Sequence, residues 1–192
     1  GSVWPLFTGW ASMGAYVYGR PHVGYQALMA NALLTYTSSL GYVTELLSGD
    51  FNQPFGRSSH HQVWSEAMVV TPVVRGLLGI EVSDGGKKLR FAPQLPADWD
   101  RVEARKVAVG KSKYDLTLQR VSGRLKINVT RSGPASEPLD LTLAPSFPLD
   151  ARVRAVDVQG RNIEFKTSRI GDRQHALVNF EMREQSVEVT FV

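Results

Sequence analysis

The distribution of charged side chains constrains the fold of this chain more than any other feature of its sequence. Residues 1–80 contain six Asp, Glu, Lys or Arg residues, whereas the remaining 112 residues contain 34. Aromatic residues show the opposite bias, since 11 of the 18 Phe, Trp and Tyr residues lie in the first 80. Two parts with such different compositions predict two domains, with a boundary near residues 79–86.

The longest uncharged segment, residues 21–44, raises the question of a membrane span, which needs about 20 apolar residues. Polar side chains interrupt the segment along its whole length: His22, Gln26, Asn31, Thr35, Thr37, Ser38 and Ser39. No apolar run is therefore long enough to cross a bilayer, and we expect no membrane partner. A soluble helical layer that is buried on both sides explains the segment better.

Helical spacing of apolar residues predicts two helices before residue 40. The first should begin at Trp4-Pro5, with proline in the first turn, and end near Tyr18, because Gly19 and Pro21 follow. The second should cover about residues 22–39 and stop at Gly41.

A third helix is expected over about residues 60–78. Ser59 and Gln62 form a capping-box pattern at its start, and Gly79 should end it. Pro72 should kink this helix or remove one of its backbone hydrogen bonds. Three helices with so few charges would expose broad apolar faces, which soluble monomers avoid. We therefore expect them to pack against further protein, either in the same chain or in a partner.

The apolar period changes in the second half of the chain from helical spacing to alternation. Apolar residues there occupy every second position, as in Tyr114-Leu116-Leu118, Leu125-Ile127-Val129, Leu139-Leu141-Leu143 and Val187-Val189-Phe191. Short alternating strands separated by turns are typical of an antiparallel β-sandwich. The sequence predicts an α+β multidomain protein, with helices in residues 1–80, a linker and first strands in 81–100, and a β-sandwich in 101–192.

The stretch from Tyr42 to Ala67 is the strongest candidate for a functional site. Glu45 opens a loop rich in Gly, Asn, Asp, Ser and Pro, and His60, His61 and Trp64 follow it. A carboxylate with aromatic and imidazole groups beside it is typical of a carbohydrate-cleaving pocket. A plain connection between two helices is the alternative interpretation.

Four segments carry a resemblance to a known family: Gly1–Pro5, Gln62–Ala67, Arg75–Gly79 and Leu89–Trp99. Their order resembles the C-terminal part of a six-hairpin (α/α)6-toroid glycoside hydrolase, such as bacterial glycogen-debranching (amylo-α-1,6-glucosidase-like) and glucoamylase-like proteins. The resemblance implies that the helices are the last helices of such a toroid and that a small β-sandwich follows them. It also implies an oligosaccharide substrate and a remainder of the toroid upstream, in the same or a partner chain.

The resemblance further implies a role for Glu45. Glucoamylase-like toroids carry their general base on a Glu ahead of the loop that leads to a Trp-Ser-x-Ala helix, and Glu45 stands in that place before Trp64. As the base, its carboxylate would deprotonate the water that attacks the anomeric carbon. The general acid of these enzymes lies much earlier in their sequences, so no residue here is assigned to it.

Glu66 is the rival catalytic candidate. An aromatic helical setting would desolvate its carboxyl group and raise the pKa toward that of a proton donor. A carboxylate near a helix N-terminus also stabilises the helix by itself, and Glu66 could pair with an arginine instead. The sequence leaves both roles open.

Further side chains could bind the substrate, and each also has a structural alternative. Aromatic rings could stack on sugars or belong to the core, histidines could bond hydroxyls or pack, and the loop charges could line a subsite or remain solvated. The substrate-binding candidates are Trp4, Asp50, Arg57, His60, His61 and Trp64.

Several other site and partner classes are not expected. The chain has no cysteine, and adjacent histidines on a helix would not both reach one ion, so we expect no metal and no cofactor. Basic residues of the second half alternate with acidic ones, which argues against a nucleic-acid partner. A rhamnosidase-type or other toroid glycosidase remains an alternative. A non-catalytic carbohydrate-binding or scaffold module that docks on a partner chain is a second one.

Overall fold

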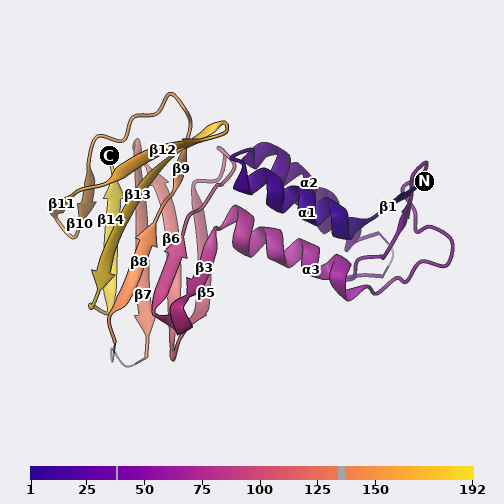
Figure 1. Cartoon of the computed structure of the whole chain (residues 1–192), viewed down its shortest axis with the longest axis horizontal. Helices are drawn as coiled ribbons and strands as arrows, with labels where there is room; N and C mark the ends of the chain where they lie inside the picture. Colours follow the sequence, from indigo (N-terminus) through magenta and orange to yellow (C-terminus); the bar gives the residue numbers. More distant parts are fainter. Residues whose placement is uncertain (38, 134–136) are drawn as a thin grey trace. The chain divides into compact units, whose positions relative to one another are not determined.

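The computed structural model describes residues 1–37, 39–133 and 137–192 and is a mixed α+β structure (Figure 1). The chain divides into two compact units, Gly1–Gly79 and Ile80–Val192. The first unit holds the helices, and the second holds nearly all of the β-structure. Among the described residues, no helix is long and apolar enough to cross a membrane.

The helical unit contains three α-helices, one π-helical turn and two short strands. Its elements are β1 (Ser2–Val3), α1 (Pro5–Val17), α2 (Pro21–Leu34), β2 (Leu47–Ser48), α3 (Val63–Thr71) and η1 (Pro72–Leu77). α1 contacts both α2 and α3, and the three helices lie side by side (Figure 1). The strands β1 and β2 form an antiparallel pair at the N-terminal end of α1.

α1 ends where the sequence predicts. Gly19 adopts a left-handed conformation with φ 67°, which glycine tolerates without strain. Its amide donates to the carbonyl of Tyr16, and the amide of Arg20 donates to that of Ala15 at 2.7 Å. These two bonds form a Schellman motif, which satisfies carbonyl groups left over at the helix end.

The other two helix predictions need correction at their ends. α2 ends at Leu34 rather than near residue 39, and Ser38 of the predicted range lies outside the described residues. The Thr35 hydroxyl donates to the Ala32 carbonyl, and the Thr37 hydroxyl donates to that of Leu34. These side-chain bonds satisfy carbonyls of the last turn and let the helix stop early.

The Ser59–Gln62 capping box does not form, because α3 begins at Val63 and Gln62 makes no side-chain capping bond. Residues 58–62 run instead beside the segment that contains Glu45. The amide of Glu45 donates to the Ser59 carbonyl at 2.8 Å, and the amide of Gln62 donates to the Val43 carbonyl at 3.1 Å. Pairing with a distant segment thus prevents residues 60–62 from being helical.

Pro72 changes the helix as the sequence predicts, and Asn31 compensates for it. Proline has no amide to donate to the Met68 carbonyl one turn earlier. The buried Asn31 side chain donates to that carbonyl at 3.3 Å and to the Pro5 carbonyl at 2.7 Å. Beyond Pro72 the chain continues as the π-helical η1. The side-chain amide of Asn31 on α2 therefore links the backbones of α1 and α3.

Replacing Asn31 should destabilise the helical unit for this reason. Asn31→Ala leaves two carbonyl oxygens in the core short of a donor, which should cost about 1–3 kcal/mol in the free energy of unfolding. Asn31→Asp should cost more at neutral pH, because a carboxylate would face two acceptor oxygens. Urea unfolding measures both effects. The control is Gln26→Ala at an exposed position of α2, and equal stability of Asn31→Ala and the control would contradict the bridging role.

The second unit consists of two sheets. One has the order β11-β10-β14-β7-β6-β5, and the other has the order β12-β13-β8-β4-β3, with β9 paired to β13. The strands are β3 (Ile80–Ser83), β4 (Lys88–Phe91), β5 (Arg101–Val109), β6 (Ser112–Val121), β7 (Arg124–Ser132), β8 (Leu139–Leu143), β9 (Ser146–Phe147), β10 (Val156–Val158), β11 (Arg161–Ile163), β12 (Lys166–Ile170), β13 (Arg173–Met182) and β14 (Ser186–Phe191). A short 3₁₀ turn, η2 (Asp84–Gly86), connects β3 to β4.

The predicted alternation is confirmed on the central strands. Leu116 and Leu118 of β6 and Leu141 and Leu143 of β8 are each at most 1% exposed, while the residues between them are partly accessible. Strand pairing differs from the prediction in one respect. β4 runs parallel to β8, with Leu89 opposite Leu141, so the sheets are not wholly antiparallel. This pairing joins strands about 50 residues apart, which local periodicity cannot reveal.

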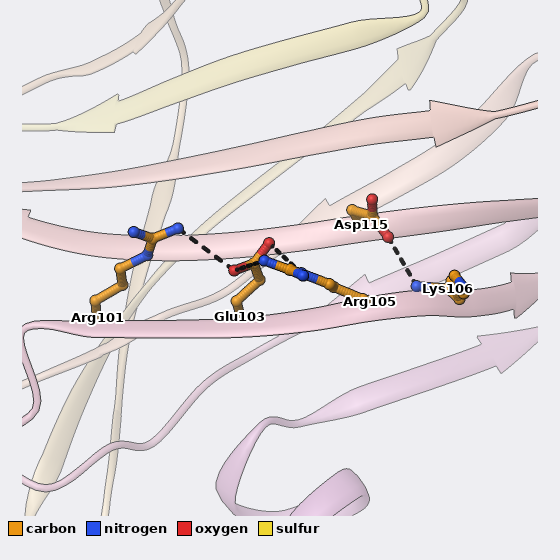
Figure 2. A network of polar contacts seen from close by, with 5 residues as sticks. All are labelled: Arg101, Glu103, Arg105, Lys106 and Asp115. Atoms are coloured by element: carbon orange, nitrogen blue, oxygen red, sulfur yellow. Dashed lines mark hydrogen bonds and ion pairs between the residues drawn. The ribbon is translucent and has the colours of Figure 1, made fainter.

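Charged side chains cover the outer edge of the first sheet on β5 and β6 (Figure 2). Glu103 accepts hydrogen bonds from Arg105 at 2.8 Å and from Arg101 at 3.4 Å. The bond from Arg105 lowers the pKa of Glu103 below its usual value. Lys106 stands at a register shift with φ 57°, and its amide donates to Asp115 at 2.7 Å. Such exposed ion pairs contribute little to stability. The bond between the Lys106 amide and Asp115 acts on the backbone at the register shift, where it helps to set the shape of the sheet edge.

His175 on β13 is the buried titratable group that should make this unit sensitive to acid. The side chain is 6% exposed, and its Nδ1 lies 3.2 Å from the Ala144 carbonyl oxygen. Burial lowers the pKa of His175 below 6.5; the Ala144 carbonyl opposes this effect, and nearby Arg90 and Arg173 reinforce it.

We therefore expect stability to fall as the pH drops below about 6.5. In that range the unfolded chain binds a proton that the folded chain excludes, so acid favours unfolding. His175→Gln should show a smaller loss of unfolding free energy between pH 7.5 and pH 5.5 than the wild type. Urea titrations at the two pH values measure the difference. Identical losses in both proteins would show that His175 is not the group responsible.

Candidate functional site

The candidate site is built on two chain segments, residues 43–48 and 54–62, that run beside each other. Thr44 and Ser58 join them through a buried hydrogen bond of 2.9 Å between their hydroxyl oxygens. The Ser58 hydroxyl also accepts from the amide of Leu46 at 2.8 Å, and the Thr44 hydroxyl donates to the Ser59 carbonyl at 3.0 Å. Since these groups lie on both sides of Glu45, the backbone of Glu45 is held between two anchored residues.

Glu45 itself is partly buried, and its amide is the donor to the Ser59 carbonyl described above. The next residue after Ser59 is His60. This bond brings the carboxylate-bearing residue to the segment that enters α3, although the two lie about 15 residues apart in sequence. The carboxylate is therefore carried by a pinned backbone rather than by a free loop.

Trp4 is brought to the same region by β1. Val3 pairs with Leu47, and Ser2 pairs with Ser48. Trp4 directly follows Val3, and Glu45 lies two residues before Leu47. The pairing of Val3 with Leu47 therefore brings the backbones of Trp4 and Glu45 near each other. The Trp4 ring also begins a row of three aromatic rings on α1, because its centroid is 5.4 Å from that of Phe7, which is 5.4 Å from Trp10.

The two histidines differ in their surroundings from the sequence prediction. Both precede α3 on non-helical backbone instead of forming its first turn. The His61 ring stacks on Tyr42, with ring centroids 4.2 Å apart and an angle of 15° between the planes. The stack orients His61 on Tyr42, and both side chains remain exposed.

The remaining candidates occupy the loop tip and the first turn of α3. Asp50 and Arg57 are exposed, and the amide of Asp50 donates a hydrogen bond to the Ser48 hydroxyl oxygen at 3.1 Å. Trp64 is 41% exposed. Glu66 lies in the first turn of α3 and is partly buried. In that position its negative charge interacts favourably with the dipole of α3 and stabilises the helix, which is the structural role open to Glu66 from the sequence.

Sequence reasoning missed Thr44 and Ser58, the residues that anchor the site. In the sequence they look like ordinary polar loop residues, and no periodic signal marks them. Among the described residues, no three His, Asp or Glu side chains gather as a metal site would require. The arrangement offers a carboxylate, imidazole groups and aromatic side chains, a mixture that suits polar organic substrates.

No protein-family model and no curated protein matches the sequence. Solved structures show partial likeness. A putative kojibiose phosphorylase from the human microbiome aligns over 93% of this chain at 11% identity, with a TM-score of 0.48. An α-1,4-glucan lyase of Gracilariopsis lemaneiformis aligns over 57% at 9% identity, with a TM-score of 0.40. A GH31 dextranase of Flavobacterium johnsoniae aligns over 54% at 10% identity, with a TM-score of 0.38.

This chain spans less than a fifth of the length of each of these proteins, with 19%, 14% and 16% covered. Likeness of this degree does not decide the activity of the chain. The assignment of function therefore rests on the residues of the site.

Proposed function

We propose that this chain is the C-terminal portion of a glycoside hydrolase that acts on α-linked glucosides or related oligosaccharides. In this proposal α1–α3 are the last helices of an (α/α)6 toroid, and the two sheets form the β-sandwich that follows it. Glu45 is the general base that activates water, and Glu66 is the alternative.

The observation that supports this proposal best is the attachment of Glu45 to the Ser59 carbonyl. Catalytic carboxylates must be held in a fixed position relative to substrate, because small displacements cost large factors in rate. The Thr44–Ser58 bond anchors the residue on one side, and the Leu46 amide anchors it on the other. These buried bonds order the loop on both sides of Glu45 and so fix the backbone from which its carboxylate extends.

The aromatic and polar candidates fit a sugar subsite around that carboxylate. Trp4 reaches the site through the β1–β2 pair and offers a ring face for stacking on a pyranose. Two of the polar candidates, Arg57 and His60, lie on the segment 54–62. Asp50 lies on the loop between the two segments, and Trp64 lies in the first turn of α3. Sugars present apolar ring faces and many hydroxyl groups, so a mixture of aromatic and polar side chains is the appropriate lining.

A glycosidase also needs a general acid, which we place in the remainder of the toroid, in the same chain or in a partner. The helical unit has the surface for such a neighbour. Phe7, Trp10, Val17 and Leu33 on α1 and α2 are each more than 50% exposed. Apolar exposure on this scale favours contact with further protein.

The same exposed faces favour a second candidate, a non-catalytic module that docks on a partner chain and leaves Glu45 with a structural role. Turnover separates the two. The experiment compares Glu45→Gln, Glu66→Gln and wild type in the intact protein, using aryl α-glycosides and malto-oligosaccharides. An unaffected rate in Glu45→Gln with a loss in Glu66→Gln moves the base to Glu66, and unaffected rates in both favour the docking module.

A further inference from the structure

A second feature with the properties of a binding site lies in the β-rich unit, remote in sequence from Glu45. It is a cavity of about 440 Å³ beside the turn that joins β6 to β7. Leu125, Ser146 and Arg173 are its buried lining residues, at 4%, 3% and 6% exposure. Exposed Arg124 and Pro148 also line it and connect it to solvent. A volume of this size accommodates a small organic molecule.

The cavity carries an excess of positive charge. Arg120, Arg124 and Arg173 line it, whereas Asp100 is the one acidic residue among its lining residues. Burial lowers the pKa of Arg120, although the charges of Asp100 and Asp98 oppose this effect. Burial also lowers the pKa of Arg173, and the charge of Arg120 lowers it further. Two guanidinium groups therefore repel each other at this site, and bound negative charge would relieve that repulsion.

Arg120 is held firmly in this arrangement. Its Nη1 donates to the carbonyl oxygens of Pro96 at 2.9 Å, Ala97 at 3.3 Å and Trp99 at 2.9 Å. These backbone contacts orient the guanidinium but carry no net charge, and the carboxylates of Asp98 and Asp100 act on it as well. A preorganised positive group of this kind is suited to anion recognition, because little side-chain entropy is lost on binding.

Two buried polar atoms of the cavity lining have no hydrogen-bond partner in the described part of the chain. They are Nε of Arg173 and the hydroxyl oxygen of Ser146. Arg173 does donate from Nη2 to the Leu95 carbonyl at 3.3 Å. Leaving a buried donor unsatisfied is unfavourable, and more so for a charged group. Both atoms expose almost no surface, so either side chain would have to turn toward the cavity before an acceptor-rich ligand could complete it.

We propose that this cavity binds a small organic oxyanion, a molecule that carries a carboxylate or a phosphate group on an apolar body. The anionic oxygens accept from Arg173, Ser146 and the neighbouring guanidinium groups, since planar guanidinium groups match both carboxylate and phosphate. Leu125, Phe147 and Pro148 provide the apolar part of the lining. This site lies beyond the proposed glycosidase function and does not depend on Glu45.

The test uses three probes with the same aromatic body, namely benzoate, phenyl phosphate and neutral benzyl alcohol. Amide NMR spectra of the full chain are recorded during titration with each probe, at an ionic strength held constant with chloride. We expect saturable shifts at Ser122–Arg124, Ser146 and Arg173 with at least one anion, and none with benzyl alcohol. Saturation by benzoate alone identifies a carboxylate site, and saturation by phenyl phosphate alone identifies a phosphate site.

Variants then connect binding to the cavity. Arg173→Gln should weaken binding of the anion at least tenfold. Arg169→Gln, on the exposed strand β12, should leave the affinity for the anion unchanged. If Arg173→Gln does not fold, the rim variant Arg124→Gln and the floor variant Ser146→Ala should each weaken binding several-fold. Absence of saturable shifts overturns the proposal. Equal binding of benzyl alcohol, or anion affinity unchanged in the folded cavity variants, overturns it as well.

Discussion

Glu45→Gln is expected to lower turnover of oligosaccharide or aryl α-glycoside substrates about 10²–10⁴-fold in the intact protein, while the fold is retained. The amide has nearly the shape of the carboxylate but cannot accept the proton of the attacking water. The Glu45 backbone bond to Ser59 and the Thr44–Ser58 pair do not involve its side chain, so they should survive the substitution. Steady-state kinetics measures the loss, and circular dichroism verifies the fold.

A chemical rescue makes this experiment more specific. Azide is already a good nucleophile and needs no deprotonation, so it should restore turnover in Glu45→Ala, where the shortened side chain leaves room for it. Rescue by azide, together with loss in Glu45→Gln, supports a base. Loss of activity without rescue, accompanied by a lower unfolding midpoint, would indicate that Glu45 stabilises the loop instead. The matched control is Glu81→Gln on exposed β3, which should be fully active.

Gly9→Ala is expected to destabilise the helical unit by about 3 kcal/mol or more, through overpacking between α1 and α3. A β-carbon at residue 9 would lie 2.2 Å from Cβ and 2.7 Å from Cγ of Met68. Because Cβ of Met68 is attached directly to the backbone of α3, no rotation of its side chain removes the contact. The helices would have to separate, and packed cores resist such movement.

Gly14→Ala provides a matched control on the same helix. No atom lies within 4 Å of a β-carbon built at residue 14, so the new methyl group meets open space. Alanine also favours the helix over glycine, and the variant should gain about 0.5–1 kcal/mol. Two identical substitutions five residues apart should thus have opposite effects on the urea midpoint.

A double variant tests the physical cause of the Gly9 effect. Met68→Ala removes Cγ and Sδ but keeps Cβ, the atom closest to the added methyl group. It should therefore fail to rescue Gly9→Ala. Full rescue by Met68→Ala would place the conflict at the flexible end of the methionine, and a neutral Gly9→Ala would contradict the close approach of α1 and α3 altogether.

The sequence by itself determined the features that depend on neighbouring residues. Gly19 ends α1 because a left-handed residue and two local hydrogen bonds suffice to stop a helix. Alternating Leu residues define β6 and β8 because side chains on a strand point to opposite faces with period two. The few charges of residues 1–80 predict exposed apolar helix faces, which α1 and α2 do present.

Only the tertiary structure decided features that depend on partners far along the chain. α3 begins at Val63 because the Glu45 amide bonds the Ser59 carbonyl, and a capping pattern cannot anticipate that pairing. Asn31 compensates for Pro72 across two helices. Arg173 looks like any charged residue of a solvated strand, yet it is buried beside a cavity. Long-range hydrogen bonds and burial outweigh local preference at these positions, because a buried polar group must find its partner wherever the fold brings one.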